Sequence, residues 1–174
     1  MFERCKVWSG DVGAGHWPDA DMLPIGALRQ NTNPSDWTNF TGIELTTMIN
    51  LWCIFRSPLM IGGELTKLDD FSLMLLSNVN VIEMNKYGRH AHQVWRRETD
   101  GTELVLWVSS RSLGGFYAGV FNIGEEEADV SVPLTDMEIY ESLEITDLWS
   151  GKKRSADVIE THLAPHASSV YRLQ

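Results

Sequence analysis

The spacing of the apolar residues changes near Gly88, and this change constrains the fold more than any other feature of the sequence. Before Gly88, apolar residues recur every three or four positions with short apolar links between them, which is typical of helices. After Gly88, short runs that alternate apolar and polar residues take over, as in antiparallel strands. The 174 residues therefore predict two structurally different parts.

A helix is predicted to follow Thr41. Thr41 and Glu44 have the spacing of a capping box, in which the threonine hydroxyl and the glutamate carboxylate bind each other's free amides. Pro58 disfavours helical backbone in the residue before it, so the helix should end at Arg56 or Ser57. Its wide apolar face consists of Ile43, Leu45, Met48, Ile49, Trp52 and Phe55.

The sequence after this helix predicts one strand and two more helices. Residues 59–61, three apolar residues before a glycine pair, are typical of a fully buried strand that ends in a tight turn. Residues 69–76 have a helical pattern, and Asn80 and Glu83 repeat the capping-box spacing at the start of a short helix. Helices alternating with strands favour an α/β arrangement with parallel strands.

Residues 1–88 offer only two candidate strands, which is too few for a complete parallel sheet. An eight-stranded α/β barrel usually takes about 250 residues. Residues 1–88 are therefore expected to be the tail of a larger domain. Apolar surface should then be exposed on Met60, on Ile61 and on the helix that carries Trp52, where the missing units would pack.

Six runs in the second part are predicted to be strands: 93–96, 104–108, 116–123, 128–132, 143–148 and 169–173. Asp100-Gly101, Gly114-Gly115 and Ser150-Gly151 are turn signals between them. Several short strands punctuated by turns predict an antiparallel β-sandwich over residues 89–174.

Charge and cysteine content narrow the range of partners. The net charge of −10 and the isoelectric point of about 4.8, without a Lys/Arg cluster, argue against nucleic acid and anionic membranes. The chain contains no apolar run long enough to span a bilayer, and its first residues lack the apolar region of a signal peptide. Cys5 and Cys53 do not have CxxC spacing; Cys53 is predicted to be a buried thiol, and a disulfide between the two stays open.

The densest group of chemically active side chains lies in residues 16–26. If the backbone there is extended, Asp19 and Asp21 point the same way, roughly 6.5–7 Å apart. Two carboxylates beside Trp17 and Met22 suit a sugar pocket, because carboxylates accept hydrogen bonds from hydroxyls while apolar side chains cover C–H faces. The same carboxylates also fit half of a metal site or a structural surface loop.

The other histidines and tryptophans favour structural roles. His90 and His92 are two residues apart, like a metal-binding pair, but no third ligand converges on them in the sequence. Trp95, Trp107 and Trp149 lie in predicted strands, which favours the sandwich core or a domain interface over a sugar platform. No metal site is therefore predicted.

Residues 17–26, Trp-Pro-Asp-Ala-Asp-Met-Leu-Pro-Ile-Gly, resemble the W-N-D-P-D-M-L-x-I-G segment of glycoside hydrolase family 27, which contains α-galactosidases and α-N-acetylgalactosaminidases. Residues 44–65 are similar to the penultimate helix and last barrel strand of that family, and residues 75–85 to its closing helices. Residues 147–151 and 163–173 resemble its sandwich strands. The resemblance covers essentially the whole chain, in the order of the family.

The resemblance implies the last βα units of a (β/α)8 TIM barrel, over residues 1–88, followed by a C-terminal antiparallel β-sandwich over residues 89–174. It implies a retaining glycosidase of terminal α-galactosides that needs no metal or cofactor and uses two carboxylates. Both come from earlier barrel strands, and no position here corresponds to them, so this chain alone is expected to be inactive. Pro18 and Ala20 replace the usual Asn and Pro, which leaves the preferred sugar open, N-acetylgalactosaminides and arabinopyranosides included.

The resemblance also assigns the substrate-binding residues. Asp21 and Met22 are expected to contact the sugar, and Trp17 and Asp19 to shape the loop. Asp19 and Asp21 are rejected as the catalytic pair, because carboxylates on one strand face cannot flank a glycosidic bond from opposite sides. Two other functions stay open: a non-catalytic sugar-binding or structural sandwich module, and a truncated product without activity of its own.

Overall fold

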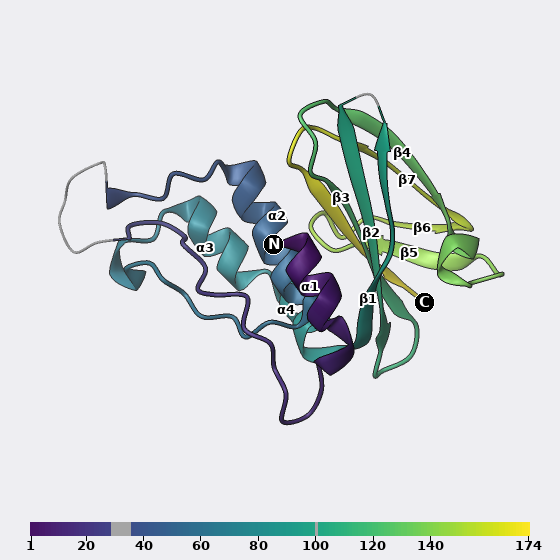
Figure 1. The fold of residues 1–174 in the computed structure, drawn as a ribbon, viewed down its shortest axis with the longest axis horizontal. Coiled ribbons are helices and arrows are strands. Elements are labelled where there is room, and N and C mark those ends of the chain that lie inside the picture. The colour runs from purple at the N-terminus through teal and green to yellow at the C-terminus, as the bar shows by residue number, and fades with distance from the viewer. Residues whose placement is uncertain (29–35, 100) are drawn as a thin grey trace.

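The computed structural model describes residues 1–28, 36–99 and 101–174, with the helices gathered at one end of the molecule and the strands at the other (Figure 1). The helices are α1 (Phe2–Trp8), α2 (Gly42–Phe55), α3 (Asp70–Ser77) and α4 (Val79–Tyr87). Single 3-10 turns are η1 (Ser9–Asp11), η3 (Leu65–Lys67) and η4 (Leu134–Met137). In the described part of the chain, no helix is both long and apolar enough to cross a membrane.

Helix α2 confirms the prediction made from its capping box. The Thr41 hydroxyl accepts a hydrogen bond from the Glu44 amide at 3.2 Å, and the Glu44 carboxylate accepts one from the Thr41 amide at 2.7 Å. These bonds to Thr41 hold the pKa of Glu44 below its usual value. At the other end, Arg56 adopts a left-handed conformation with φ of 68°, which ends the helix two residues before Pro58.

Helices α3 and α4 follow each other almost without a break. Asp69 caps α3, in agreement with the helix predicted to begin there. Its carboxylate accepts a hydrogen bond from the Ser72 amide at 2.8 Å. The predicted capping box at Asn80 is wrong, because the chain enters α4 two residues earlier. Asn78 has the extended backbone of a cap, and its side chain accepts hydrogen bonds from the amides of Asn80 and Val81.

The buried strand predicted at residues 59–61 is present only as an isolated parallel bridge between Ile61 and Leu23. Leu23 donates to the Met60 carbonyl at 2.7 Å and accepts from the Gly62 amide at 2.9 Å. Met60 is 46% exposed and Ile61 37% exposed, so the prediction of a fully buried strand is wrong. Leu23 is the bridge partner of Ile61 in the described part of the chain, and one partner does not make a strand buried on both faces.

The exposed apolar surface expected on this part is confirmed at Met60 and Ile61. On α2 the exposed residue is Ile43, at 46%, whereas the Trp52 side chain is buried. Cys5 and Cys53 are both free and buried, so no disulfide joins them. Burial raises the pKa of Cys5 to about 11 and that of Cys53 to about 12, which makes both thiols unreactive near neutrality.

The second part is an antiparallel sandwich of two sheets, as predicted. One sheet has the order β1-β2-β3-β8-β5-β6, and β4 and β7 form the other. The strands are β1 (Gly88–Thr99), β2 (Thr102–Arg111), β3 (Phe116–Asn122), β4 (Ala128–Pro133), β5 (Leu143–Asp147), β6 (Lys153–Ala156), β7 (Val158–Leu163) and β8 (Ser168–Leu173). The sequence did not predict β6 and β7.

Glycines occupy the turns that the sequence indicated. Four of these turn glycines have positive φ, a backbone conformation that residues with a Cβ rarely adopt: Gly101, Gly114, Gly115 and Gly151. Asp100, the other half of the predicted Asp100-Gly101 turn, lies outside the described residues.

The six-stranded sheet separates two apolar cores. Trp107 and Tyr117 are completely buried on the face that packs against the helices, so Trp107 is a core residue, as predicted. Val108 and Ala118 belong to the other core, beneath β4 and β7. Alternate residues of one strand thus serve opposite cores, as the two-residue period of a strand requires.

Polar side chains join α2 to the sandwich. The Trp149 indole nitrogen donates to Asn50 Oδ1 at 3.0 Å, and the Asn50 amide nitrogen donates to the Ser168 hydroxyl at 2.9 Å. One turn earlier, the Thr47 hydroxyl donates to the His166 carbonyl at 2.6 Å. Trp149 is therefore an interface residue, the structural role that its position favoured.

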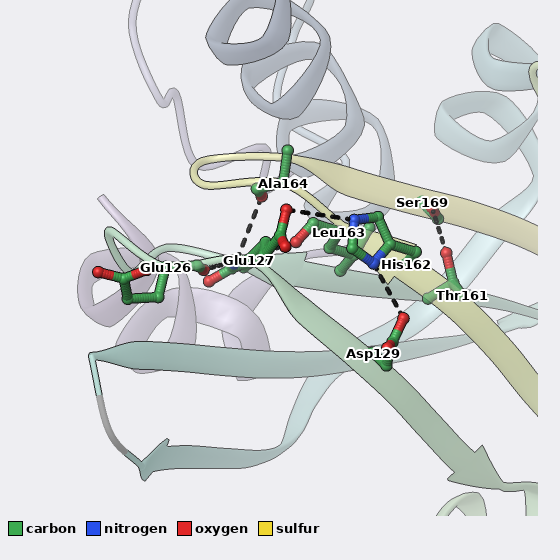
Figure 2. Close-up of polar contacts among 9 residues, drawn as sticks. Glu126, Glu127, Asp129, Thr161, His162, Leu163, Ala164 and Ser169 are labelled. Carbon is green, nitrogen blue, oxygen red and sulfur yellow. Dashed lines mark hydrogen bonds and ion pairs between the residues drawn. The ribbon is translucent and has the colours of Figure 1, made fainter.

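A cluster of charged side chains lies where β4 begins and β7 ends. Figure 2 shows His162 between Glu127 and Asp129, with ring-to-carboxylate distances of 3.6 and 2.9 Å. The hydrogen bond with Asp129, together with the negative charge of both carboxylates, raises the pKa of His162. The adjacent Thr161 hydroxyl lies 3.1 Å from that of Ser169, so β7 and β8 are also linked here (Figure 2).

Candidate sugar-binding site

The loop that carries the four candidate site residues is anchored through its backbone. Ser57 lies just after α2, and its hydroxyl accepts a hydrogen bond from the Ala20 amide at 2.9 Å. The Trp52 indole nitrogen, from the last turns of α2, donates to the Asp21 carbonyl at 2.8 Å. With the bridge at Leu23, three long-range contacts fix a stretch of four residues.

Asp21 does not continue an extended segment, because its φ is 79°. The predicted arrangement, with Asp19 and Asp21 on one face of a strand, is therefore wrong. Asp19 Oδ1 accepts a hydrogen bond from the Asp21 amide at 2.9 Å, and Asp21 Oδ1 accepts one from the Met22 amide at 2.7 Å. These short-range bonds from side chain to backbone stabilise the left-handed conformation at Asp21, which a regular strand would not contain.

Trp17 lies over the cationic end of Arg56, whose guanidinium carbon is 4.4 Å from the ring centroid. Arg56 is itself held by a 3.0 Å hydrogen bond from Nε to the Asn85 carbonyl of α4. The Trp17 side chain remains 43% exposed and that of Met22 54% exposed. Both apolar surfaces are thus open to a ligand, with Trp17 held in place by the residue that ends α2.

A pocket of about 310 Å³ lies between the loop and helix α1. Asp19 and Asp21 line it, whereas Trp17 and Met22 are not among its lining residues. The opposite wall includes Arg4 and Trp8, which sequence reasoning missed as site residues. Their spacing of four places them on one face of a helix, a signal that was readable in the sequence.

Both carboxylates retain acceptor capacity toward this pocket. Each uses Oδ1 for the backbone of the turn, and within residues 1–28, 36–99 and 101–174 neither Oδ2 has a hydrogen-bond partner. An ionised carboxylate oxygen can accept from a sugar hydroxyl. No group of three or more His, Cys, Asp or Glu side chains in the described part of the chain has the arrangement of a metal site.

The backbone behind the loop makes one approach that only glycine allows. A Cβ built on Gly63 would lie 1.9 Å from the Ile25 carbonyl oxygen. Gly26 has a φ of 75°, and the Glu64 amide donates to the Ala27 carbonyl at 2.7 Å. Gly63 therefore lets the chain after α2 pass directly against the chain after the site.

Comparison with known proteins extends over both parts of the chain. Residues 90–173 match the family model described as the alpha galactosidase C-terminal beta sandwich domain. A crystal structure of a GH27 β-L-arabinopyranosidase from Geobacillus stearothermophilus superimposes with a TM-score of 0.89 and 40% identity, over 100% of this chain and 40% of that one. An α-galactosidase from Saccharomyces cerevisiae has the same fold, with a TM-score of 0.83 at 19% identity over 99% of this chain and 50% of that one.

The curated relatives are named as α-galactosidases. Alpha-galactosidase D of Emericella nidulans is 30% identical over 157 residues, which cover 87% of this chain and 22% of the relative. Alpha-galactosidase 2 of Arabidopsis thaliana is 27% identical over 95% of this chain and 40% of the relative. The chain thus spans less than half the length of either of these relatives.

The antiparallel sandwich of residues 90–173 is the C-terminal domain of an α-galactosidase-type glycoside hydrolase. The chain belongs to glycoside hydrolase family 27 and corresponds to the C-terminal portion of the family's proteins.

Proposed function

We propose that this chain is part of an α-galactosidase-like retaining glycoside hydrolase that cleaves terminal α-galactosides, and that it supplies one wall of the sugar site. Residues 1–88 are the last βα units of the catalytic (β/α)8 barrel, and residues 89–174 are the sandwich that follows it. The parallel bridge between Leu23 and Ile61 supports the barrel assignment, because adjacent barrel strands are parallel.

Asp21 is the residue on which the proposal depends most. Its left-handed backbone, its Trp52-bound carbonyl and its Met22-bound Oδ1 fix the carboxylate in one place, while Oδ2 is left to accept from a sugar hydroxyl. Met22 covers an apolar face of the sugar. Trp17 and Asp19 shape the loop, Trp17 through Arg56 and Asp19 through the Asp21 amide.

The two catalytic carboxylates belong to a part of the protein outside these 174 residues. Retaining glycosidases hold the nucleophile and the acid/base about 5–5.5 Å apart on opposite sides of the scissile bond. Asp19 and Asp21 each bind a backbone amide of the same short segment through Oδ1, so neither is free to move to the far side of a sugar. The chain alone therefore binds sugar without cleaving it.

A β-L-arabinopyranoside is the second candidate substrate. The G. stearothermophilus β-L-arabinopyranosidase is 40% identical to this chain, compared with 30% for the E. nidulans α-galactosidase. The two sugars have the same ring stereochemistry and differ in the hydroxymethyl group at C5, which arabinopyranose lacks. Residues that accept or exclude that group decide between the two substrates.

Binding is tested by titrating the chain with methyl α-D-galactopyranoside and following the amide resonances of residues 19–22. Asp21→Asn keeps an oxygen for the Met22 amide but removes the negative charge, so binding is expected to weaken about tenfold. Asp11→Asn, which changes another exposed aspartate, is the matched control. Equal affinity in all three proteins would contradict the assignment of Asp21.

Catalysis is tested with nitrophenyl α-D-galactopyranoside and nitrophenyl β-L-arabinopyranoside. The chain alone is expected to release no nitrophenol above background, and turnover would place the catalytic carboxylates within it. An in-frame coding sequence upstream of Met1 that restores activity would support the enzyme over a sugar-binding module or a truncated product. The ratio of the two rates then identifies the substrate.

A further inference from the structure

A second pocket, of about 400 Å³, opens in the sandwich between β1, β2, β3 and the η4 turn. Val108 and Phe116 in its wall belong to the core beneath β4 and β7, not to the core shared with the helices. In Figure 1, η4 lies on the side of the sandwich away from the helices. This pocket is thus separate from the one that Asp19 and Asp21 line.

Two residues that line this pocket have left-handed backbone, although neither is a glycine. His90, in β1, has a φ of 52°, and Glu138, which ends η4, has a φ of 61°. His90 also lies at a break in the β1–β2 register, between the pairs formed by Arg89 and His92. Bulges re-aim side chains, and left-handed backbone in residues other than glycine is costly and concentrates at functional sites.

Two polar side chains that line the pocket are not used by the fold. Within the described ranges, neither the His90 ring nor the Glu138 carboxylate has a hydrogen-bond or ion-pair partner. His92 Nδ1 lies 3.0 Å from the His90 carbonyl, to which it can only donate, so Nε2 of the neutral ring is an acceptor. Asp136, by contrast, is occupied by the Trp95 indole and by Arg97.

The apolar part of the wall complements these groups. Phe116 and Met137 supply an aromatic and a thioether surface beside the two histidines and Glu138. A neutral pyranose combines hydroxyls that donate and accept with C–H faces that pack on such surfaces. The net charge of −10 disfavours an anionic ligand, and the described residues form no metal-binding group here.

We propose that this pocket is a second carbohydrate site, which binds a neutral pyranose unit on the sandwich at a distance from the Asp21 loop. Glu138 accepts from one hydroxyl, His92 Nε2 accepts from another, and the His90 ring binds a third. Phe116 covers one face of the sugar ring. Since the proposal rests on the sandwich alone, it stands or falls independently of the catalytic assignment.

Glycine substitution gives a test that does not threaten the fold. At positive φ, His90→Gly and Glu138→Gly remove the side chain and relieve the backbone, so the melting temperature should stay level or rise. The amide resonances of Ser110 and Met137 report binding of methyl α-D-galactopyranoside at this pocket. The affinity fitted from their shifts should fall at least about tenfold in each variant. Asp21→Asn should leave those shifts unchanged while it weakens those at residues 19–22.

The outcomes separate the two sites. Saturable shifts at Ser110 and Met137 that vanish in both glycine variants and persist in Asp21→Asn support the second site. Shifts confined to residues 19–22, shifts that survive both glycine variants, or shifts produced by inorganic phosphate but not by the glycoside would overturn it.

Discussion

The Trp52 indole nitrogen and the Asp21 carbonyl oxygen, 31 residues apart in the sequence, are 2.8 Å apart in the structure. The donor comes from the buried side of α2 and the acceptor from the turn that carries the candidate sugar-binding carboxylate. Asp21 has left-handed backbone, and its carbonyl is held by a side chain of α2. Helix α2 therefore acts as the support on which the site loop is set.

Replacing Trp52 by Phe removes this hydrogen bond and part of a buried ring. We expect the free energy of unfolding to fall by about 1–3 kcal/mol. We also expect weaker galactoside binding at residues 19–22, because the turn loses its anchor. Denaturant unfolding measures the first effect and the NMR titration the second. Met48→Leu, a partly buried change on the same helix, is the control for general loosening of α2. A stable Trp52→Phe variant with unchanged binding would contradict the support role.

Asn50 joins the helices to the sandwich and is completely buried. In Asn50→Ala, the Trp149 indole nitrogen loses its acceptor and the Ser168 hydroxyl loses a donor. The expected cost is about 1–3 kcal/mol, since a partly buried donor is left unsatisfied. A double-mutant cycle with Trp149→Phe measures the pair directly. The two losses should be less than additive, and full additivity would show that the bond contributes nothing.

Gly63→Ala should destabilise the segment behind the site. The new Cβ would meet the Ile25 carbonyl oxygen at 1.9 Å, and backbone on both sides must shift to admit it. We expect a loss of about 1–3 kcal/mol or more in unfolding free energy. Gly10→Ala is the matched control, because a Cβ there meets nothing within 4 Å. If both variants melt at the wild-type temperature, the close approach of the two segments is not present in solution.

The His162 cluster should make stability depend on pH. Asp129 and Glu127 raise the pKa of His162 above the unfolded value of about 6.5. Its contribution is therefore complete below about pH 6.5 and is lost as the pH rises through the higher folded pKa. NMR titration of the His162 ring measures the shift, and Asp129→Asn should lower it, whereas Asp157→Asn should not. A His162 pKa that Asp129→Asn leaves unchanged would exclude this cause.

Local chemistry made the ends of the helices predictable. A capping box and a proline define α2 through residues that lie within a turn of its ends, and Asp69 does the same for α3. The capping residue of α4 was misplaced because two asparagines, Asn78 and Asn80, compete for the position. Only the backbone conformation distinguishes them.

Tertiary features were less predictable. Strand β6 is formed largely by exposed, charged residues at the edge of the sheet, so its sequence has little of the apolar signal of a strand. The sequence predicted that Asp19 and Asp21 belong to the site, but it did not predict the backbone conformation that positions them. The left-handed turn at Asp21 depends on Trp52 and Ser57, which are more than thirty residues away. Arg4 and Trp8 reach the same pocket through the packing of α1.

The six-stranded sheet also determines how the protein unfolds. Its Trp107 face completes the core of the helices and its Val108 face completes the core of the sandwich. Neither half can unfold alone without exposing one face of a sheet that the other half still requires. Thermal denaturation should therefore follow one cooperative transition, with helix and strand signals lost at the same temperature.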